Sequence, residues 1–408
     1  MRYINHRYFI HFCHPTSTFF SIIPFPSSTH NSNPNFPEMG SRRSFLRSWS
    51  SPLFLFVVVV ALAASSADGS RAPRVPCYFI FGDSLYDSGN NNNLNTSAKV
   101  NYSPYGIDLP AGPTGRFSNG QTTADAIAID LLISFGYAGE ILGFKDFIPP
   151  FASNPDDRQI LVGVNYASGS AGILVESGKQ GGDNVDLSQQ LRNHELTVSR
   201  IVEILGSKVA AFEYLGQCLY ICDSGNNDYI NNYILPQSTA IRNQYNPDQF
   251  AALLITQYSA QIIRLYELGA RKVALAGISN IGCTPSLIAT LGTNGAPCVN
   301  SVNQLVVPFN TRLKSLISQL KLSYPDAKFA YLDSVRVGTL VGAVFRFAAF
   351  RIRATSCCQV STVTGLCLPN TVPCSQRPSY LFWDAFHPTE LANQLAAPLF
   401  FPAIQRIL

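Results

Sequence analysis

A regular alternation of short apolar strands and longer helical segments is the feature that most limits how this chain can fold. The predicted strands cover Tyr78–Phe81, Ile160–Val164, Leu219–Ile221, Lys272–Ala276 and Phe329–Leu332. The predicted helices cover residues 122–132, Leu187–Leu205, Asp248–Leu268, Val302–Tyr324 and Thr389–Ile407, and a capping box at Thr122 starts the first of them. Strands separated by helices pair in parallel, with helices on both faces of the sheet. We therefore expect an α/β fold, with residues 75–408 forming a single domain.

The two ends of this region carry the residue types of a hydrolytic triad. The first strand runs into Gly82-Asp83-Ser84-Leu85, so Ser84 stands at its carboxyl end, the edge at which parallel sheets bind ligands. Asp384 and His387 follow near the end of the chain. A serine hydroxyl becomes a good nucleophile when a histidine, itself held by a carboxylate, takes its proton. The sequence predicts catalytic roles for Ser84, Asp384 and His387.

Elimination supports His387 as the base. Of six histidines, four lie before residue 31, which leaves His194 and His387 in the predicted domain. Polar neighbours surround His194, so we expect it on a solvent-exposed helix face. Pro388 disfavours helical geometry at His387 and suits the first turn of the next helix, which fixes the imidazole at a loop–helix junction. The alternative is a helix-start residue without chemistry.

A tetrahedral intermediate also needs hydrogen-bond donors for its oxyanion. The candidates are the Ser84 N–H, a glycine N–H after the second strand, which Gly169 follows, and the Asn227 amide. For the Asn-Asn-Asp cluster around Asn227, the alternative is an ordinary turn, because these residues favour turns.

Composition and missing motifs exclude other classes. The net charge is only +4 and the basic residues are scattered, so we expect no nucleic-acid partner. The G-x-S-x-G elbow is absent because residue 86 is Tyr. No phosphate-binding loop, dinucleotide motif or H-E-x-x-H motif occurs, so we expect neither a cofactor nor a metal.

The N-terminal part has the pattern of a secretory signal peptide at residues 39–67. Arg42, Arg43 and Arg47 precede an apolar run, Leu53–Ala64, and small residues follow. The alternative, a membrane anchor, needs about 20 apolar residues, more than this run provides. We interpret residues 1–38 as an upstream extension before an initiator at Met39. The mature protein is then expected outside the cell, as a monomer without a membrane span.

Ten cysteines fit an exported protein. We expect a Cys283–Cys298 disulfide, and two more that join Cys357 and Cys358 to Cys367 and Cys374 in an order left open. Three other cysteines are predicted to be unpaired: Cys218 and Cys222 as buried thiols on one strand face, and Cys77 as the odd one. The two N-glycosylation sequons are at Asn95 and Asn101.

The chain resembles the plant-type GDSL esterase/lipase family, also called SGNH hydrolases. The shared blocks are Phe81-Gly82-Asp83-Ser84-Leu85, Asn101-Tyr102-Ser103-Pro104-Tyr105-Gly106-Ile107-Asp108, residues 112–120, Asn165-Tyr166-Ala167-Ser168-Gly169, Gly225-Asn226-Asn227-Asp228-Tyr229 and residues 382–389. The resemblance implies a three-layer α/β/α, flavodoxin-like fold. It also implies a Ser84–His387–Asp384 triad that forms an acyl-enzyme, with oxyanion donors at Ser84, at Gly169 or alternatively nearby Gly172, and at Asn227. The implied substrates are carboxylic esters of small molecules, lipids or polysaccharides.

Two segments depart from the family pattern. Cys222-Asp223-Ser224 stands where small or apolar residues are usual, so an inward-pointing Asp223 would disturb the oxyanion site. Residues 335–356 are apolar and basic where the family has a Pro- and Gly-containing loop. Two further hypotheses stay open beside ester hydrolysis: an apoplastic acyltransferase that builds polyesters, and a wall-binding protein without activity.

Overall fold

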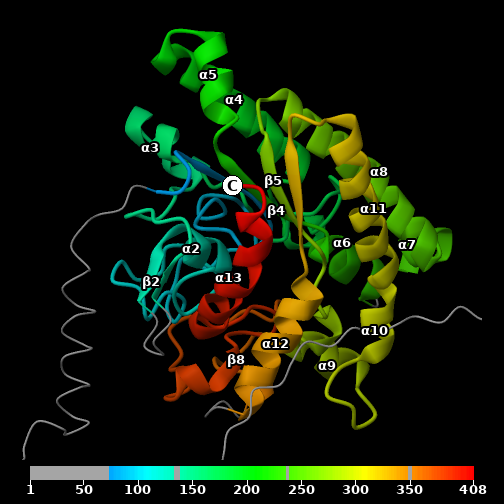
Figure 1. The fold of residues 1–408 in the computed structure, drawn as a ribbon. Coiled ribbons are helices and arrows are strands. Elements are labelled where there is room, and N and C mark those ends of the chain that lie inside the picture. Colours follow the sequence, from blue (N-terminus) through cyan, green and yellow to red (C-terminus); the bar gives the residue numbers. More distant parts are fainter. Residues whose placement is uncertain (1–72, 133–137, 236–238, 348–351) are drawn as a thin grey trace, which may run out of the picture. The chain divides into compact units, whose positions relative to one another are not determined.

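A parallel sheet forms the centre of the fold (Figure 1). The computed structural model describes residues 73–132, 138–235, 239–347 and 352–408, which lie in one compact unit, Ser70–Leu408. Four strands make the sheet in the order β1 (Tyr78–Gly82), β4 (Leu219–Asp223), β5 (Lys272–Ala276) and β6 (Lys328–Leu332), and each neighbouring pair is parallel. The predicted signal peptide and the segment before it fall outside the described residues.

The second predicted strand is wrong in its position. Residues of Ile160–Val164 instead belong mostly to a helix, α3 (Asp157–Val162), which starts with a capping box between Asp156 and Gln159. The extended segment comes just afterwards: the Ile80 N–H donates to the Val164 carbonyl at 3.1 Å and the Ile80 carbonyl accepts from the Tyr166 N–H at 2.8 Å. Residues 164–168 thus extend the sheet beyond β1, and the spatial order of extended segments is that of flavodoxin-like folds.

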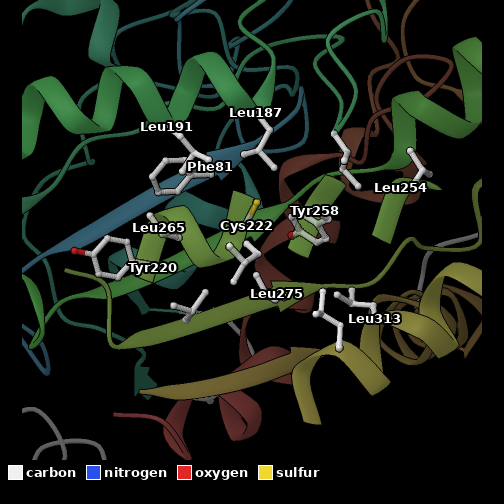
Figure 2. Packing of buried hydrophobic residues seen from close by; sticks show 14 of the residues in the cluster. Phe81, Leu187, Leu191, Tyr220, Cys222, Leu254, Tyr258, Leu265, Leu275 and Leu313 are labelled. Atoms are coloured by element: carbon white, nitrogen blue, oxygen red, sulfur yellow. The ribbon is translucent and has the colours of Figure 1, made fainter. Parts of the chain in front are cut away.

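Two layers of helices cover the sheet, because alternate strand residues face opposite sides. On one face, Phe81, Tyr220 and Leu275 pack against α4 (Leu187–Leu205), α8 (Pro247–Glu267) and α11 (Val307–Ser323) (Figure 2). On the other, Ile80, Ile221 and Ala274 pack with α2 (Thr123–Ala128), α12 (Ser334–Phe347) and α13 (Glu390–Gln405). In Figure 1, α13 and α2 lie on the side of the sheet away from α8 and α11. The expected three-layer α/β/α fold is confirmed.

Shorter elements complete the described part of the chain. They are the helices α5 (Lys208–Leu215), α6 (Asn226–Tyr229), α7 (Thr239–Gln244), α9 (Pro285–Leu291) and α10 (Asn300–Leu305), and two small sheets that pair β2 (Asp130–Leu132) with β3 (Ala138–Glu140) and β7 (Ile352–Ser356) with β8 (Tyr380–Phe382). Among the described helices, none is both long and apolar enough to cross a membrane.

Two predicted helices differ from the structure: one ends earlier, and the other is divided into two helices. The helix from Thr122 ends at Ala128, and the next residues enter β2, so the apolar residues after Ala128 do not continue its face. The predicted helix Val302–Tyr324 is divided between α10 and α11. Pro308, in the first turn of α11, explains the division, because proline lacks the N–H that a continuous helix needs and favours a helix start.

Four disulfides are present in the described residues. Cys283–Cys298 is confirmed, and the remaining loop pairs are Cys357–Cys374 and Cys358–Cys367. The fourth, Cys77–Cys218, shows that the prediction of free thiols at these two positions was wrong. Tyr78 and Leu219 are partners in the β1–β4 ladder, so the cysteines just before them also face each other. Cys222 is the free, buried cysteine, and burial raises the pKa of its thiol to about 12.

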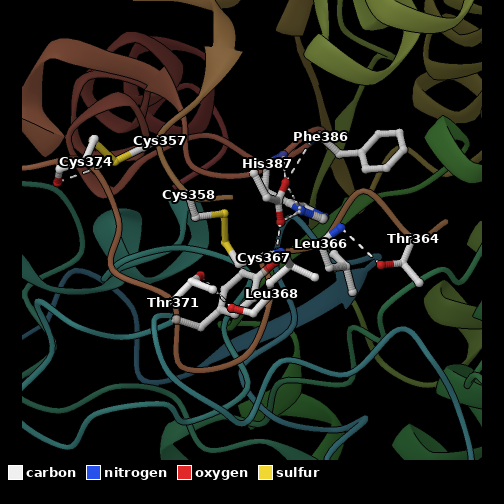
Figure 3. The surroundings of a disulfide bond; sticks show 12 residues. Cys357, Cys358, Thr364, Leu366, Cys367, Leu368, Thr371, Cys374, Phe386 and His387 are labelled. Atoms are coloured by element: carbon white, nitrogen blue, oxygen red, sulfur yellow. Dashed lines mark hydrogen bonds and ion pairs between the residues drawn. A yellow bond between two sulfur atoms is a disulfide. The ribbon is translucent and has the colours of Figure 1, made fainter. Parts of the chain in front are cut away.

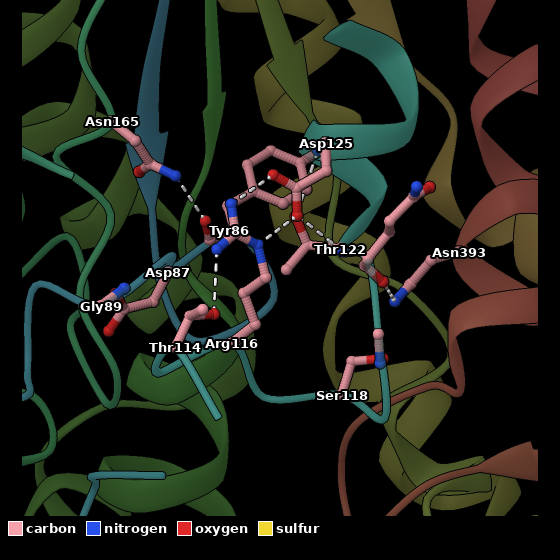
Figure 4. A network of polar contacts seen from close by, with 12 residues as sticks. Tyr86, Asp87, Gly89, Thr114, Arg116, Ser118, Thr122, Asp125, Asn165 and Asn393 are labelled. Carbon is pink, nitrogen blue, oxygen red and sulfur yellow. Dashed lines mark hydrogen bonds and ion pairs between the residues drawn. The ribbon is translucent and has the colours of Figure 1, made fainter. Parts of the chain in front are cut away.

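A buried ion pair fixes the start of α2 (Figure 4). Arg116 Nε and Nη2 each donate to the Asp125 carboxylate at 2.8 Å, and the two side chains are only 6% and 4% exposed. Thr122 and Asp125 form the capping box: the Thr122 N–H donates to the Asp125 carboxylate and the Asp125 N–H donates to Thr122 Oγ1. The Thr122 hydroxyl donates to the same carboxylate. Burial alone would raise the pKa of Asp125, but the charge and hydrogen bonds of Arg116 and Thr122 outweigh it and lower that pKa below its usual value.

Replacing Arg116 should therefore destabilise the protein strongly. In Arg116→Leu, the Asp125 carboxylate stays buried without its cation, and the free energy of unfolding should fall by about 3–5 kcal/mol. Urea denaturation followed by circular dichroism measures this change. The matched control is Arg200→Leu, since Arg200 pairs with Asp157 on the exposed surface and its loss should barely move the midpoint. Equal midpoint shifts in both variants would contradict the role given to burial.

Candidate active site

The three residues predicted as a triad lie in direct contact at the carboxyl edge of the sheet. His387 Nε2 is 2.8 Å from Ser84 Oγ, at the end of β1. His387 Nδ1 is 2.8 Å from Asp384 Oδ2 and 2.9 Å from Oδ1. A carboxylate on Nδ1 requires the proton on that nitrogen, which leaves the Nε2 lone pair facing the hydroxyl. This arrangement can remove a proton from Ser84.

The backbone of its own turn fixes Asp384. The N–H groups of Phe386 and His387 each donate to Asp384 Oδ1 at 2.8 Å, and the Trp383 N–H donates to the His387 carbonyl at 2.7 Å. The Asp384 side chain is fully buried. Asp384 and His387 are three residues apart because they lie in one tight turn. In this turn, the Asp384 carboxylate accepts hydrogen bonds from the backbone N–H groups of Phe386 and His387.

Sequence reasoning missed one residue of this site. Tyr105 Oη donates to Asp384 Oδ2 at 2.6 Å, and both residues are buried. Tyr105 lies in the Asn101–Asp108 block, which the sequence marked as shared with the family but without a role. No local pattern indicates the contact, because it joins residues 279 positions apart.

Two of the residues predicted to supply oxyanion donors, Ser84 and Asn227, line the cavity beside the site. Asn227 lines the cavity described below, and its amide is held in place: Nδ2 donates to the Ala171 carbonyl at 3.0 Å and Oδ1 accepts from Asn231 at 3.1 Å. Nδ2 keeps a second hydrogen for a ligand. The Ser84 N–H has no hydrogen-bond acceptor among the described residues.

Gly169 does not fit the role that sequence analysis gave it. Its N–H already donates to Asp87 Oδ2 at 2.9 Å, so it is not available to an oxyanion in this structure. A Cβ at Gly169 would lie 2.6 Å from Phe117 and 2.7 Å from Asn91, so close packing accounts for the glycine. Gly172 is similarly enclosed, with a Cβ position 2.5 Å from Asp228. The loop residue that lines the cavity is Ser170, which has a φ of 60°.

Two buried carboxyl groups lie beside Ser84. Asn226 Nδ2 donates to Asp83 Oδ2 at 3.0 Å and to Asp223 Oδ1 at 3.2 Å. Burial raises the pKa of Asp83 to about 6, and burial together with the charge of Asp83 raises the pKa of Asp223 well above its usual range. Asp223 does line the cavity, and the upward shift of its pKa favours the neutral carboxyl over a charge beside Ser84.

The other histidine of the domain, His194, was predicted to lie on a solvent-exposed helix face, and this prediction was wrong. His194 is fully buried, its Nδ1 lies 3.1 Å from the Tyr166 hydroxyl, and the rings of Phe79 and Phe81 pack against it. Burial lowers the pKa of His194 to about 3, so the ring is neutral. The spacing of Leu187, Leu191, His194, Val198 and Ile201 marks the buried face of α4 and was visible in the sequence.

A cavity of about 930 Å³ opens beside Ser84 and His387. Its polar wall includes Asn227 and Ser170, and its apolar wall comes largely from Val337, Val341, Leu381, Phe386 and Phe400. The first two apolar residues belong to α12, so the segment that departs from the family pattern forms part of this wall. Within the described ranges, no group of three or more His, Cys, Asp or Glu side chains is placed to hold a metal ion.

Comparisons with known proteins settle the family. The GDSL-like lipase/acylhydrolase family model matches residues 78–400. This chain is a member of the GDSL esterase/lipase family. GDSL esterase/lipase At1g29670 of Arabidopsis thaliana is 43% identical over 357 residues, which cover 87% of this chain and 93% of the relative. GDSL esterase/lipase At4g18970 of the same plant is 44% identical over 344 residues, covering 84% and 91%. This GDSL esterase/lipase is accordingly a carboxylic ester hydrolase.

The raised pKa of Asp83 makes the stability of this GDSL esterase/lipase depend on pH. The folded state keeps a proton that an unfolded chain releases near pH 4, so Asp83 stabilises the fold fully below about pH 4 and loses this contribution as the pH rises through about 6. Asp83→Asn should make the fall in unfolding free energy across this interval shallower. Denaturant titrations at several pH values test this, with Ser84→Ala as the control that keeps the wild-type slope.

Proposed function

We propose that this GDSL esterase/lipase hydrolyses esters through Ser84, with His387 as the base and Asp384 as its orienting carboxylate. The 2.8 Å contact between His387 Nε2 and Ser84 Oγ carries the proposal. Ser84 Oγ attacks the ester carbonyl carbon while Nε2 takes its proton. The tetrahedral intermediate collapses, the alkoxide leaves with the proton from Nε2, and the acyl group stays on Ser84. Water then repeats the same steps and releases the acid.

Charge on the tetrahedral oxygen needs donors that are already in place. The free Ser84 N–H and the second hydrogen of the Asn227 amide are the two groups that support this role. Asp83 and Asp223 share the Asn226 amide nearby, and burial, which raises the pKa of Asp223, favours its neutral form over a negative charge that would oppose the oxyanion. We therefore assign oxyanion stabilisation to Ser84 and Asn227.

The cavity supports lipid esters as the substrate class. Apolar pockets of this size bury most of a ligand's surface and orient it with a few polar groups. Here the apolar wall from α12 and α13 adjoins the polar groups around Ser84, so an acyl chain has an apolar space next to the reacting carbonyl. A fatty acyl group fills such a space better than an acetyl group.

An extracellular location belongs to the same proposal. Four disulfides are typical of proteins that fold in oxidising compartments. The signal-peptide pattern at residues 39–67 supports export in addition. Asn95 and Asn101 are both exposed, as glycosylation at these sequons requires, and their modification stays a prediction.

Ser84→Ala tests the proposed nucleophile. The variant should lose hydrolysis of a p-nitrophenyl ester and covalent labelling by a fluorophosphonate, while its unfolding midpoint stays near that of the wild type, because only a hydroxyl is removed. Ser318→Ala, an exposed serine on α11, is the control and should keep both activities. Retained labelling in Ser84→Ala would mean that another residue is the nucleophile.

Gly342→Leu tests the substrate class. Gly342 on α12 lines the cavity, and a Cβ there meets no atom within 4 Å, so a leucine can extend into the acyl space without a backbone clash. We expect kcat/KM for decanoyl esters to fall about tenfold or more while acetyl esters are hydrolysed at the wild-type rate. Leu340→Phe adds bulk to an exposed position of the same helix and should leave this ratio unchanged. An unchanged ratio in Gly342→Leu would place the acyl chain elsewhere.

A further inference from the structure

We infer that Tyr105 is a positioning residue for Asp384, and that it links the Cys358–Cys367 disulfide to the active site. This inference rests on the proposed role of Asp384 as the carboxylate of the triad. It concerns how the carboxylate is aimed, and not which residue attacks the substrate.

The direction of the Tyr105 hydrogen bond is settled by its second partner. Tyr105 Oη accepts the N–H of Cys367 at 3.0 Å, and its own hydrogen is therefore free to point at Asp384 Oδ2, 2.6 Å away. Burial, and then the charge of Asp384, raise the pKa of Tyr105 well above its usual value, so the hydroxyl stays protonated. Tyr105 is thus a fixed, neutral donor to a buried carboxylate.

The oxygen that Tyr105 holds is one that faces the imidazole. Asp384 Oδ1 is fixed by the N–H groups of Phe386 and His387, whereas Oδ2 receives no backbone N–H among the described residues. Apart from His387 Nδ1 at 2.8 Å, Tyr105 is the donor on Oδ2. Without the tyrosine hydroxyl, Oδ1 would stay anchored but Oδ2 would lose the donor that holds it. The plane of the carboxylate relative to the imidazole would then no longer be fixed.

A closed ring of contacts connects this hydroxyl to a disulfide. Cys367 is bonded to Cys358, and the Cys358 N–H donates to the carbonyl of Trp383, the residue before Asp384. The ring therefore runs from Asp384 through Tyr105 and the disulfide and back to Trp383. Figure 3 shows the Cys358–Cys367 disulfide and His387 in one view. We expect that opening the disulfide loosens the Cys367 N–H that orients Tyr105.

Tyr102 provides a matched control on the same loop. Its Oη donates to the Cys367 carbonyl at 2.9 Å, and its ring packs edge to face on Tyr105 with centroids 5.5 Å apart. It makes no hydrogen bond to Asp384. Tyr102→Phe consequently removes a hydrogen bond from the disulfide loop but keeps the donor on the carboxylate.

The test compares Tyr105→Phe and Tyr102→Phe in the full chain with a p-nitrophenyl ester. A hydrogen bond to a charged group that acts on the triad should cost about 10- to 100-fold in kcat when removed, with KM within about twofold. We expect this loss in Tyr105→Phe and a kcat within about twofold of wild type in Tyr102→Phe. Equal losses in the two variants, or a Tyr105→Phe loss that lies in KM alone, would overturn the inference.

A second measurement covers the case in which Tyr105→Phe folds poorly. The double variant Cys358→Ser/Cys367→Ser should have a lower kcat because the Tyr105 hydroxyl is no longer oriented. Adding Tyr105→Phe to this double variant should therefore lower kcat little further. Losses that multiply would show that the disulfide and Tyr105 act independently. Ser84→Ala separates the two proposals: an active Ser84→Ala overturns the proposed function, whereas an inactive Ser84→Ala beside a fully active Tyr105→Phe overturns only this inference.

Discussion

The backbone hydrogen bonds along both edges of β1 are the interaction on which the rest of the structure depends. β1 pairs with β4 on one side and with residues 164–168 on the other. Because these three segments run in parallel, the residues that follow them arrive at the same edge of the sheet. Ser84, Ser170 and Asn227 come together for this reason, although the chain separates them widely.

The imidazole reaches that edge from the far end of the chain, and contacts between α2 and α13 bring it there. The Glu390 N–H donates to Asn119 at 2.8 Å, and the Glu390 carboxylate accepts the Gln121 N–H at 3.1 Å. Asn393 bonds both Gln121 and Thr123. The Arg116–Asp125 ion pair joins the preceding loop to the start of α2, so this buried charge pair indirectly supports the position of His387 beside Ser84.

Local sequence patterns predicted most of the secondary structure and the three residues of the proposed triad. The apolar strands, the long helices α4 and α8, and the Ser84, Asp384 and His387 cluster follow from residue spacing and strand ends. Three of the errors concern partners from another part of the chain. Cys77 and Cys218 pair because β1 and β4 are neighbours, and the Gly169 N–H is taken by Asp87, which follows a different strand. Tyr105 was missed because its hydroxyl meets a carboxylate brought in by the C-terminal segment.

His194 shows a different kind of error. Its polar neighbours in the sequence suggested exposure, but the helical period places it with the leucines of α4. The helical period is the better guide here, because a helix buries the residues that recur on one of its faces and not a continuous run of neighbours.

Ser84, the proposed nucleophile, follows the first strand, and His387, the proposed base, lies beyond the last strand of the main sheet. This separation has a consequence for how activity is acquired. Every sheet neighbour of β1 is distant in sequence, and β1 and β4 are separated by about 140 residues, as the Cys77–Cys218 span of 141 shows. Loop closure over such distances is slow and costs chain entropy before any contact compensates for it. Helical content can thus recover early in refolding while Ser84 and His387 are still apart. In this architecture, esterase activity reports the completion of the longest-range contacts in the molecule.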